Sequence, residues 1–178
     1  MTGKQLLLQA LRNETTPRPA WVPFVGVHGG KLIGATAWDY LRSSERIVAG
    51  LSRAVELYKP DGLPVVFDLQ MEAEVLGCAM HWGDQTPPSV TSHPLAQAPL
   101  SSLPGFDPAK GRFPLVAEAM AELRRRFSDE IAFYGLITGP FTLALHLMGT
   151  GIFLKMFDEV DAVREVLDFC TDVGRQAA

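Results

Sequence analysis

The sequence predicts an α/β fold, namely a partial (β/α)8 TIM barrel made of the first three or so βα units with a loop insertion. Short apolar segments alternate along the chain with segments of helical periodicity, as parallel βαβ units require. The chain has 178 residues, whereas a complete barrel has eight strands and roughly 250 residues. We therefore expect residues 1–178 to be the N-terminal portion of a barrel domain. A compact three-layer domain, complete in itself, is the alternative.

The first elements follow from capping and periodicity. Thr2 and Gln5 have the spacing of a capping box at the start of the first helix. Residues 21–27 form a short apolar run, which predicts a first strand buried on both faces. Apolar residues at helical spacing predict a helix from about residue 39 to residue 59, and Pro60 ends it.

The later elements flank a region of different composition. Between Gly77 and Gly111 the chain is rich in proline, serine and threonine, which predicts a loop insertion. Short strands within it are expected at residues 80–82 and 89–91. The other expected elements are strands at residues 63–69 and 131–137 and helices that start at Pro114 and after Asp158.

The composition indicates a soluble globular domain. A net charge of -4 argues against a nucleic acid or an anionic membrane as partner. No run approaches the roughly 20 apolar residues that a membrane helix needs. The two cysteines, Cys78 and Cys170, form no CxxC pair, so they predict no disulfide framework and fit a cytoplasmic protein in reducing surroundings.

Two segments carry the functional information. A buried strand that breaks at Gly139-Pro140 into a helix is predicted for residues 131–146 (IAFYGLITGPFTLALH), and α/β barrels place ligands at such switches. A strand that ends in Asp68 is predicted within residues 61–77 (DGLPVVFDLQMEAEVLG). Together the two segments resemble the uroporphyrinogen decarboxylase superfamily, whose members include tetrapyrrole decarboxylases and cobamide-dependent methyltransferases.

The resemblance implies a binding role for the loop after the first strand. In the decarboxylases this loop carries arginines that bind the carboxylates of the substrate. Here it contains His28, Gly30 and Lys31, and lysine cannot make the two-pronged contact of arginine. These three residues are expected to bind substrate, and a substrate with many carboxylates is disfavoured. The alternative is that they are ordinary loop residues.

Asp68 is the first catalytic candidate. A carboxylate that follows an apolar run is desolvated unless it is hydrogen-bonded, and in the decarboxylases the matching aspartate stabilises the protonated intermediate. The alternative is an N-cap for a helix near Met71. Nearby, Glu72 is expected to contact substrate in a segment that resembles the methyltransferase branch. Glu72 and Glu74 cannot share a helix face, so they are no obvious acid/base pair. Two solvated residues are the favoured alternative, because glutamate is almost never buried unpaired.

The start of the helix after residue 137 supplies the remaining candidates. Gly139, Pro140 and Phe141 are expected to contact substrate, because glycine lets the backbone approach a ligand and a helix start exposes N–H groups. His146 is the second catalytic candidate. It lies where decarboxylases carry an active-site tyrosine, and histidine can donate, accept or take a proton near neutral pH. A satisfied core histidine is the alternative.

No metal is expected on this segment, because Cys78 and His81 offer two ligands where zinc needs at least three from protein. The resemblance implies that related methyltransferases use zinc to activate a thiol, which takes a methyl group from a methylcobamide. Their zinc ligands lie later in the barrel. We expect zinc and a cobamide in the full-length methyltransferase, and no cofactor and no activity in this segment alone.

The leading hypothesis is therefore the N-terminal part of a methyltransferase that passes a methyl group from a cobamide to a thiol. Its partners would be a tetrapyrrole or corrinoid ligand and a corrinoid protein, with a homo-oligomer left open. One alternative is a uroporphyrinogen decarboxylase of porphyrin (haem) biosynthesis. The other is a non-catalytic binding fragment, whose strand edges would invite a partner.

Overall fold

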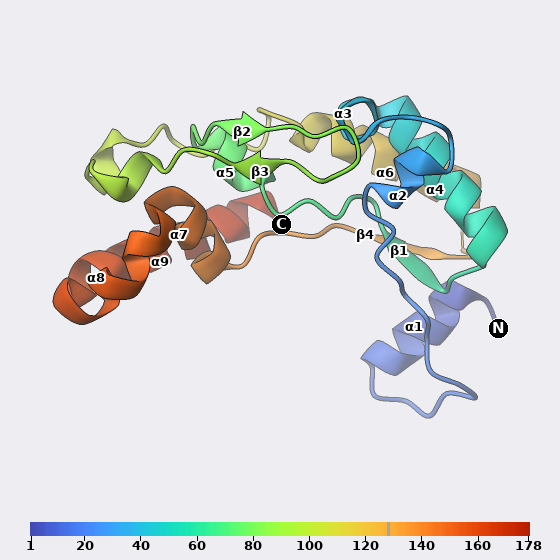
Figure 1. Ribbon diagram of the computed structural model, residues 1–178. Coiled ribbons are helices and arrows are strands. Elements are labelled where there is room, and N and C mark those ends of the chain that lie inside the picture. Colours follow the sequence, from blue (N-terminus) through green and yellow to red (C-terminus); the bar gives the residue numbers. More distant parts are fainter. Residues whose placement is uncertain (128) are drawn as a thin grey trace. The chain divides into compact units, whose positions relative to one another are not determined.

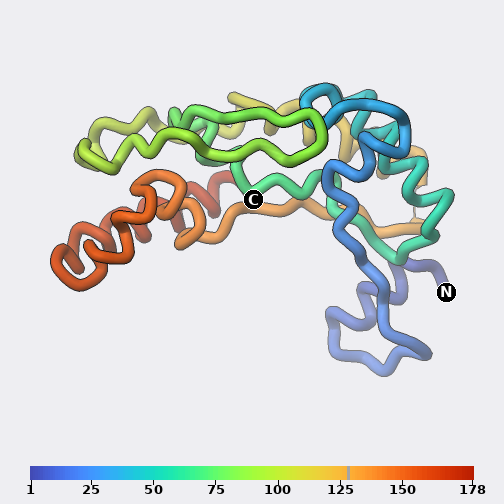
Figure 2. The backbone as a smooth tube through the Cα atoms, in the orientation of Figure 1, coloured from blue at the N-terminus to red at the C-terminus, as the bar shows by residue number. Residues whose placement is uncertain are grey.

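The computed structural model describes residues 1–127 and 129–178, which form two compact units (Figures 1 and 2). The first unit contains Met1–Phe67, Gly83–Pro87 and Leu115–Leu136. The second contains Asp68–Trp82, Pro88–Pro114 and Ile137–Ala178. Most of the chemical candidates therefore belong to the second unit, and the loop with His28 belongs to the first.

The first unit combines helices with a two-stranded parallel sheet. Its strands are β1 (Gly62–Pro64) and β4 (Ala132–Tyr134), and Leu63 of β1 lies opposite Phe133 of β4. This parallel pair agrees with the predicted α/β class. The helices of this unit are α1 (Gly3–Leu11), α2 (His28–Lys31), α3 (Ala37–Tyr40), α4 (Ser44–Tyr58) and most of α6 (Phe113–Phe127).

Two of the predicted helices show how caps set helix ends. The capping box is confirmed, because the Gln5 amide donates to the Thr2 hydroxyl at 3.2 Å and the Thr2 amide donates to Gln5 Oε1 at 3.0 Å. The helix expected from residue 39 to residue 59 is divided. Ser43 accepts from the Arg46 amide and starts α4, whereas residues 37–40 form the separate helix α3.

The prediction of a strand at residues 21–27 is wrong. Pro23 has no amide hydrogen to donate to a sheet, and Gly26 has a positive φ of 52° that turns the chain. The Asp61 amide still donates to the Trp21 carbonyl at 2.9 Å. The two later strands are confirmed but shorter than expected, because Pro64 also lacks a donor within β1.

The second unit contains the insertion and the C-terminal helices. Its strands β2 (Met80–His81) and β3 (Ser89–Val90) pair in antiparallel fashion, as Figure 1 shows, and this confirms the short strands expected in the insertion. Its helices are α5 (Met71–Val75), α7 (Pro140–Met148), α8 (Ile152–Asp158) and α9 (Val160–Ala177), with the 3-10 turns η1 (Pro94–Ala96), η2 (Leu100–Ser102) and η3 (Gly149–Gly151).

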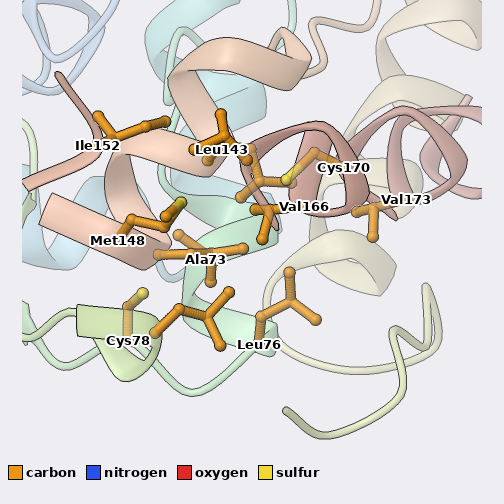
Figure 3. Packing of buried hydrophobic residues seen from close by; sticks show 13 residues of the cluster. Ala73, Leu76, Cys78, Leu143, Met148, Ile152, Val166, Cys170 and Val173 are labelled. Carbon is orange, nitrogen blue, oxygen red and sulfur yellow. The ribbon is translucent and has the colours of Figure 1, made fainter. Parts of the chain in front are cut away.

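The core of the second unit lies between α5, α7 and α9 (Figure 3). Val163, Val166 and Cys170 of α9 are buried there, as the helical spacing predicts. Buried apolar side chains of about this size each contribute roughly 1.5–3 kcal/mol to folding. The same cluster contains Leu143, Leu147 and Met148 of α7. It also contains Ala73 of α5 and Leu76, which directly follows α5.

No run was expected to be long and apolar enough for a membrane helix, but one stretch of the chain is. Pro140–Asp158 is long and apolar enough, by length and composition alone, to cross a membrane. The chain does not continue as one regular helix there, since α7 ends at Met148 and Gly149 has a φ of 69°. Because core helices of water-soluble proteins meet the same criterion, this stretch is weak evidence for a membrane segment.

Candidate functional site

Asp68 follows the apolar run that contains β1, and its carboxylate is buried at 4% exposure. One oxygen, Oδ1, accepts a hydrogen bond from the Gln70 amide at 2.9 Å. The other, Oδ2, accepts from Nη1 of Arg112 in a buried ion pair. The Gln70 bond forms a turn just before α5, and the N-cap residue of α5 is Gln70, so the alternative that Asp68 caps this helix is wrong. Both oxygens thus have partners, and this allows the charge to stay buried.

Arg112 connects this carboxylate with a second one. Its Nε donates to Oε2 of Glu74 at 2.8 Å, and its guanidinium carbon lies 4.8 Å from the centre of the Trp82 ring. The preceding residue, Gly111, has a φ of 60°, and a Cβ there would lie 2.8 Å from Val75 Cγ2. Glycine is therefore needed for the close approach that carries Arg112 to α5.

Arg112 was not predicted as a site residue, because it lies at the end of the insertion and outside the motifs that carry the resemblance. Burial would by itself lower its pKa, but the attraction of Asp68 and the hydrogen bonds to Asp68 and Glu74 outweigh burial and raise the pKa of Arg112. The available signal was an arginine between a glycine and the apolar start of a helix.

Glu72 is fully buried, at 1% exposure, and is bonded to the strand-to-helix turn. Its Oε1 accepts the Thr138 amide at 2.9 Å, and its Oε2 accepts the Thr138 hydroxyl at 2.6 Å. The prediction that Glu72 and Glu74 are solvated helix residues is thus wrong for Glu72, while Glu74 is partly buried against Arg112. Glu72 attaches α5 to the turn that begins α7.

His146 lies in α7 with its side chain partly buried. Burial lowers its pKa, and His93 lowers it further, while a hydrogen bond with the Leu69 backbone and the charges of Glu72 and Asp68 act in the opposite direction. The imidazole is therefore mainly neutral at pH 7. Its Nε2 is buried and has no hydrogen-bond partner among the described residues, so this core histidine is satisfied at one ring nitrogen only.

The backbone of His146 attaches the insertion to α7. Its carbonyl accepts hydrogen bonds from Nδ1 of His93 at 2.8 Å and from Sγ of Cys78 at 3.6 Å. A Cβ at Gly149 would lie 2.8 Å from the His93 ring, so this glycine is needed for the contact. Two side chains of the insertion therefore satisfy a carbonyl near the C-terminal end of α7.

The start of α7 has the form that the sequence predicted. Gly139 is the N-cap residue and Pro140 occupies the first turn. A Cβ at Gly139 would meet no atom within 4 Å, and a cavity of about 270 Å³ is lined here by both residues and by the end of α9. Phe141 is 41% exposed. The backbone is thus open to a ligand, and substrate contact by these three residues stays a prediction.

His28, Gly30 and Lys31 belong to the first unit and form most of α2. The Nε2 atom of His28 is hydrogen-bonded to the Tyr58 hydroxyl at 2.8 Å. A Cβ at Gly30 would lie 2.9 Å from Tyr40 Cβ, so this glycine is needed for packing. Lys31 is exposed to solvent. Substrate binding by these three residues stays a prediction. His28 and Gly30 also have structural contacts, with Tyr58 and Tyr40.

Zinc does not fit the described part of the chain. No group of three or more histidine, cysteine, aspartate or glutamate side chains that could hold a metal occurs within residues 1–127 and 129–178. Burial raises the pKa of the Cys78 thiol to about 11 and that of the Cys170 thiol to about 12, so both thiols are protonated near pH 7. We assign no chemical step to zinc on these residues.

The polar cluster of the second unit comprises Asp68 before α5, Glu72 in α5 and His146 in α7, and the bonds of Glu72 with Thr138 join α5 to the start of α7. Two buried side-chain atoms in the described part of the second unit lack a hydrogen-bond partner: Nη2 of Arg112 and Nε2 of His146. Each belongs to this cluster. Buried polar groups are normally satisfied, so two unsatisfied nitrogens in one cluster favour a ligand there.

This α/β fold with a polar cluster beside a strand-to-helix turn agrees with the class of protein that the comparisons define. The chain belongs to the uroporphyrinogen decarboxylase (URO-D) family, whose model matches residues 2–178. A solved structure, described as a methyltransferase from Methanosarcina mazei, superimposes with a TM-score of 0.87 at 26% sequence identity. The match covers 97% of this chain and 53% of that one.

Two relatives of this chain are named as methyltransferases. The methylcobamide:CoM methyltransferase MtbA of Methanosarcina acetivorans is 30% identical over 176 residues, which are 96% of this chain and 52% of that protein. The methylated-thiol–coenzyme M methyltransferase of Methanosarcina mazei is 31% identical over 119 residues, or 64% of this chain and 31% of that protein. The chain thus spans about half the length of MtbA.

Proposed function

We propose that this chain is part of a methyltransferase that passes a methyl group from a methylcobamide to a thiol. The names of the relatives support the reaction class. The observation that carries the assignment to a site is the pair of unsatisfied nitrogens, on Arg112 and His146, beside the buried carboxylate of Asp68. Within the chain, ligand binding is therefore assigned to the second unit.

The site has groups suited to a corrinoid. A corrin ring is fringed by carboxamides, each with an oxygen that accepts and an N–H that donates. The Nη2 atom of Arg112 can donate to such an oxygen. A bound methylcobamide would supply the methyl group. In this proposal a corrinoid protein presents it, and other parts of the full-length enzyme supply zinc.

His146 and Asp68 have separate chemical tasks in this proposal. A thiol must lose its proton to accept a methyl group, and a neutral imidazole with a free Nε2 can take that proton. Asp68, which is ion-paired with Arg112, stabilises the imidazolium that forms. Glu72 keeps the start of α7 in place through Thr138, so that His146 is held in position.

The decarboxylase alternative has less support. The relatives described above are methyltransferases by name. In addition, Oδ2 of Asp68 is already bonded to Arg112, which leaves less of this carboxylate for the N–H groups of a tetrapyrrole. The loop that carries the decarboxylase arginines has only Lys31 as a cation here, together with a histidine that hydrogen-bonds Tyr58.

Ligand titration of the full-length enzyme, of which this chain is a part, tests the proposal. Methylcobalamin and uroporphyrinogen are titrated separately into wild type, His146→Ala and Asp68→Asn, with Arg164→Ala on the exposed face of α9 as the control. We expect methylcobalamin to bind wild type and the control, and to bind both site variants at least about tenfold more weakly. Loss of carboxylates from uroporphyrinogen, insensitive to a chelator and abolished in Asp68→Ala, would contradict the proposal and support the decarboxylase.

A further inference from the structure

We propose that Arg112 is a positioning residue that holds the Asp68 carboxylate in its working orientation, an inference that rests on the function proposed above. Three contacts fix its guanidinium group. Nη1 bonds Asp68, Nε bonds Glu74 at 2.8 Å, and the Trp82 ring lies against its plane at 4.8 Å. A side chain held at two edges and one face cannot change its direction without losing several contacts at once.

The carboxylate of Asp68 is fixed by two donors from different parts of the chain. The Gln70 amide, two residues further along, holds Oδ1, and Arg112, which is 44 positions away, holds Oδ2. The local bond alone leaves the carboxylate free to rotate about it. With Arg112 in place, both oxygens have assigned directions. The orientation of Asp68 therefore depends on the end of the insertion, and not only on its own strand.

The charges of this cluster explain why an arginine is needed. Asp68 and Glu74 are both ion-paired with Arg112, and no other ion pair to either carboxylate occurs in the part of the chain that the structure describes. A lysine would supply one point charge, whereas the guanidinium fork reaches both carboxylates from separate nitrogens. Arg112→Lys should thus keep the charge and lose the orientation.

The same geometry distinguishes positioning from general stability. Arg18 binds Asp61 through two nitrogens at 2.6 and 2.7 Å, and Asp61 is buried to 4% exposure, like Asp68. That pair lies in the first unit. Arg18→Met is therefore a matched control, since it also leaves a buried carboxylate without its cation but does so outside the proposed site.

The first measurement needs no ligand. The Gln70 amide proton reports the position of Asp68 Oδ1, because it donates to that atom. We expect its NMR resonance to move in Arg112→Met and Arg112→Lys toward its value in Asp68→Asn, and to stay in place in Arg18→Met. A Gln70 resonance that is unchanged in both Arg112 variants, in folded protein, would overturn the proposal.

The second measurement is a double-mutant cycle on methylcobalamin affinity. Arg112→Met should weaken binding at least about tenfold in the wild-type background and less than about twofold in Asp68→Asn, because its effect passes through Asp68. Equal losses in both backgrounds, or the same loss in Arg18→Met, would overturn it. Wild type that fails to bind methylcobalamin while the Gln70 resonance responds to Arg112 would reject the proposed function and retain the positioning role.

Discussion

Glu72 and Thr138 lie 66 positions apart, and the glutamate accepts both the amide and the hydroxyl of the threonine, at 2.9 and 2.6 Å. Glu72 has no ion-pair partner among the residues that the structure describes. Two hydrogen bonds therefore replace a cation as compensation for burying this carboxylate. The pair joins α5 to the turn at which α7 begins.

The first prediction concerns this pair. Glu72→Gln keeps the volume of the side chain but turns an N–H group toward one donor of Thr138, so we expect the free energy of unfolding to fall by roughly 1–3 kcal/mol. Thr138→Val should cost a similar amount and Thr138→Ser much less, since serine keeps the hydroxyl. Urea denaturation measures these changes. Glu165→Gln on the exposed face of α9 is the control, and an equal loss there would contradict the assignment.

The second prediction concerns Asp61, whose pKa is lowered chiefly by its hydrogen bond with Arg18. A lowered carboxylate pKa contributes stability that is present above the unfolded value of about 3.9 and is lost as the pH falls through the folded pKa. Asp61→Asn should therefore reduce the free energy of unfolding by roughly 1–3 kcal/mol at pH 7 and by less below about pH 3. Denaturant titrations from pH 2 to pH 7 measure the difference. A constant difference across that range would reject the linkage.

The third prediction concerns His146, whose pKa is lowered by burial. The unfolded chain then binds a proton more readily than the folded one, so stability is unaffected above the unfolded value of about 6.5 and falls as the pH drops below it. His146→Gln should remove this part of the acid sensitivity. Thermal denaturation from pH 5 to pH 8, with His81→Gln as the exposed control, tests it. Parallel curves for wild type and His146→Gln would show that His146 is not the responsible group.

The fourth prediction concerns the thiols. Burial raises the pKa of Cys78 to about 11 and that of Cys170 to about 12, so little thiolate is present at pH 8. A thiol reagent such as dithionitrobenzoate should react slowly with the folded chain and quickly in denaturant. Cys78→Ala and Cys170→Ala then assign the two phases. Rapid reaction of either cysteine in the folded state would show that its burial is only transient.

The fold could be predicted where local rules act alone. The capping box of Thr2, the helix of residues 113–127 and the pairing strands of the insertion were all expected, because capping residues and apolar spacing determine them locally. The same signal wrongly predicted a strand at residues 21–27. An apolar run does not reveal that Pro23 and Gly26 deny it the hydrogen bonds of a sheet.

The candidate site was predictable only in part. Asp68 and His146 could be named, since each lies in a motif that carries the resemblance. Arg112 could not, because its partners are 38 and 44 positions away and nothing local marks an arginine as buried. Glu72 was expected to contact substrate, with a solvated residue as the favoured alternative, and its two bonds to Thr138 are again long-range contacts that composition does not reveal.

The anchoring of the insertion has a consequence for redesign of the chain. Cys78 and His93 attach its first part to the end of α7, and Arg112 attaches its last part to α5. Between these anchors, Leu103 and Phe106 pack on the apolar core and the Phe106 ring contacts Phe113, whereas Gly105 itself has open space around it. A peptide tag or a fused domain should therefore be inserted near Gly105, whereas shortening the loop at either anchor would disturb the residues that surround Asp68 and His146.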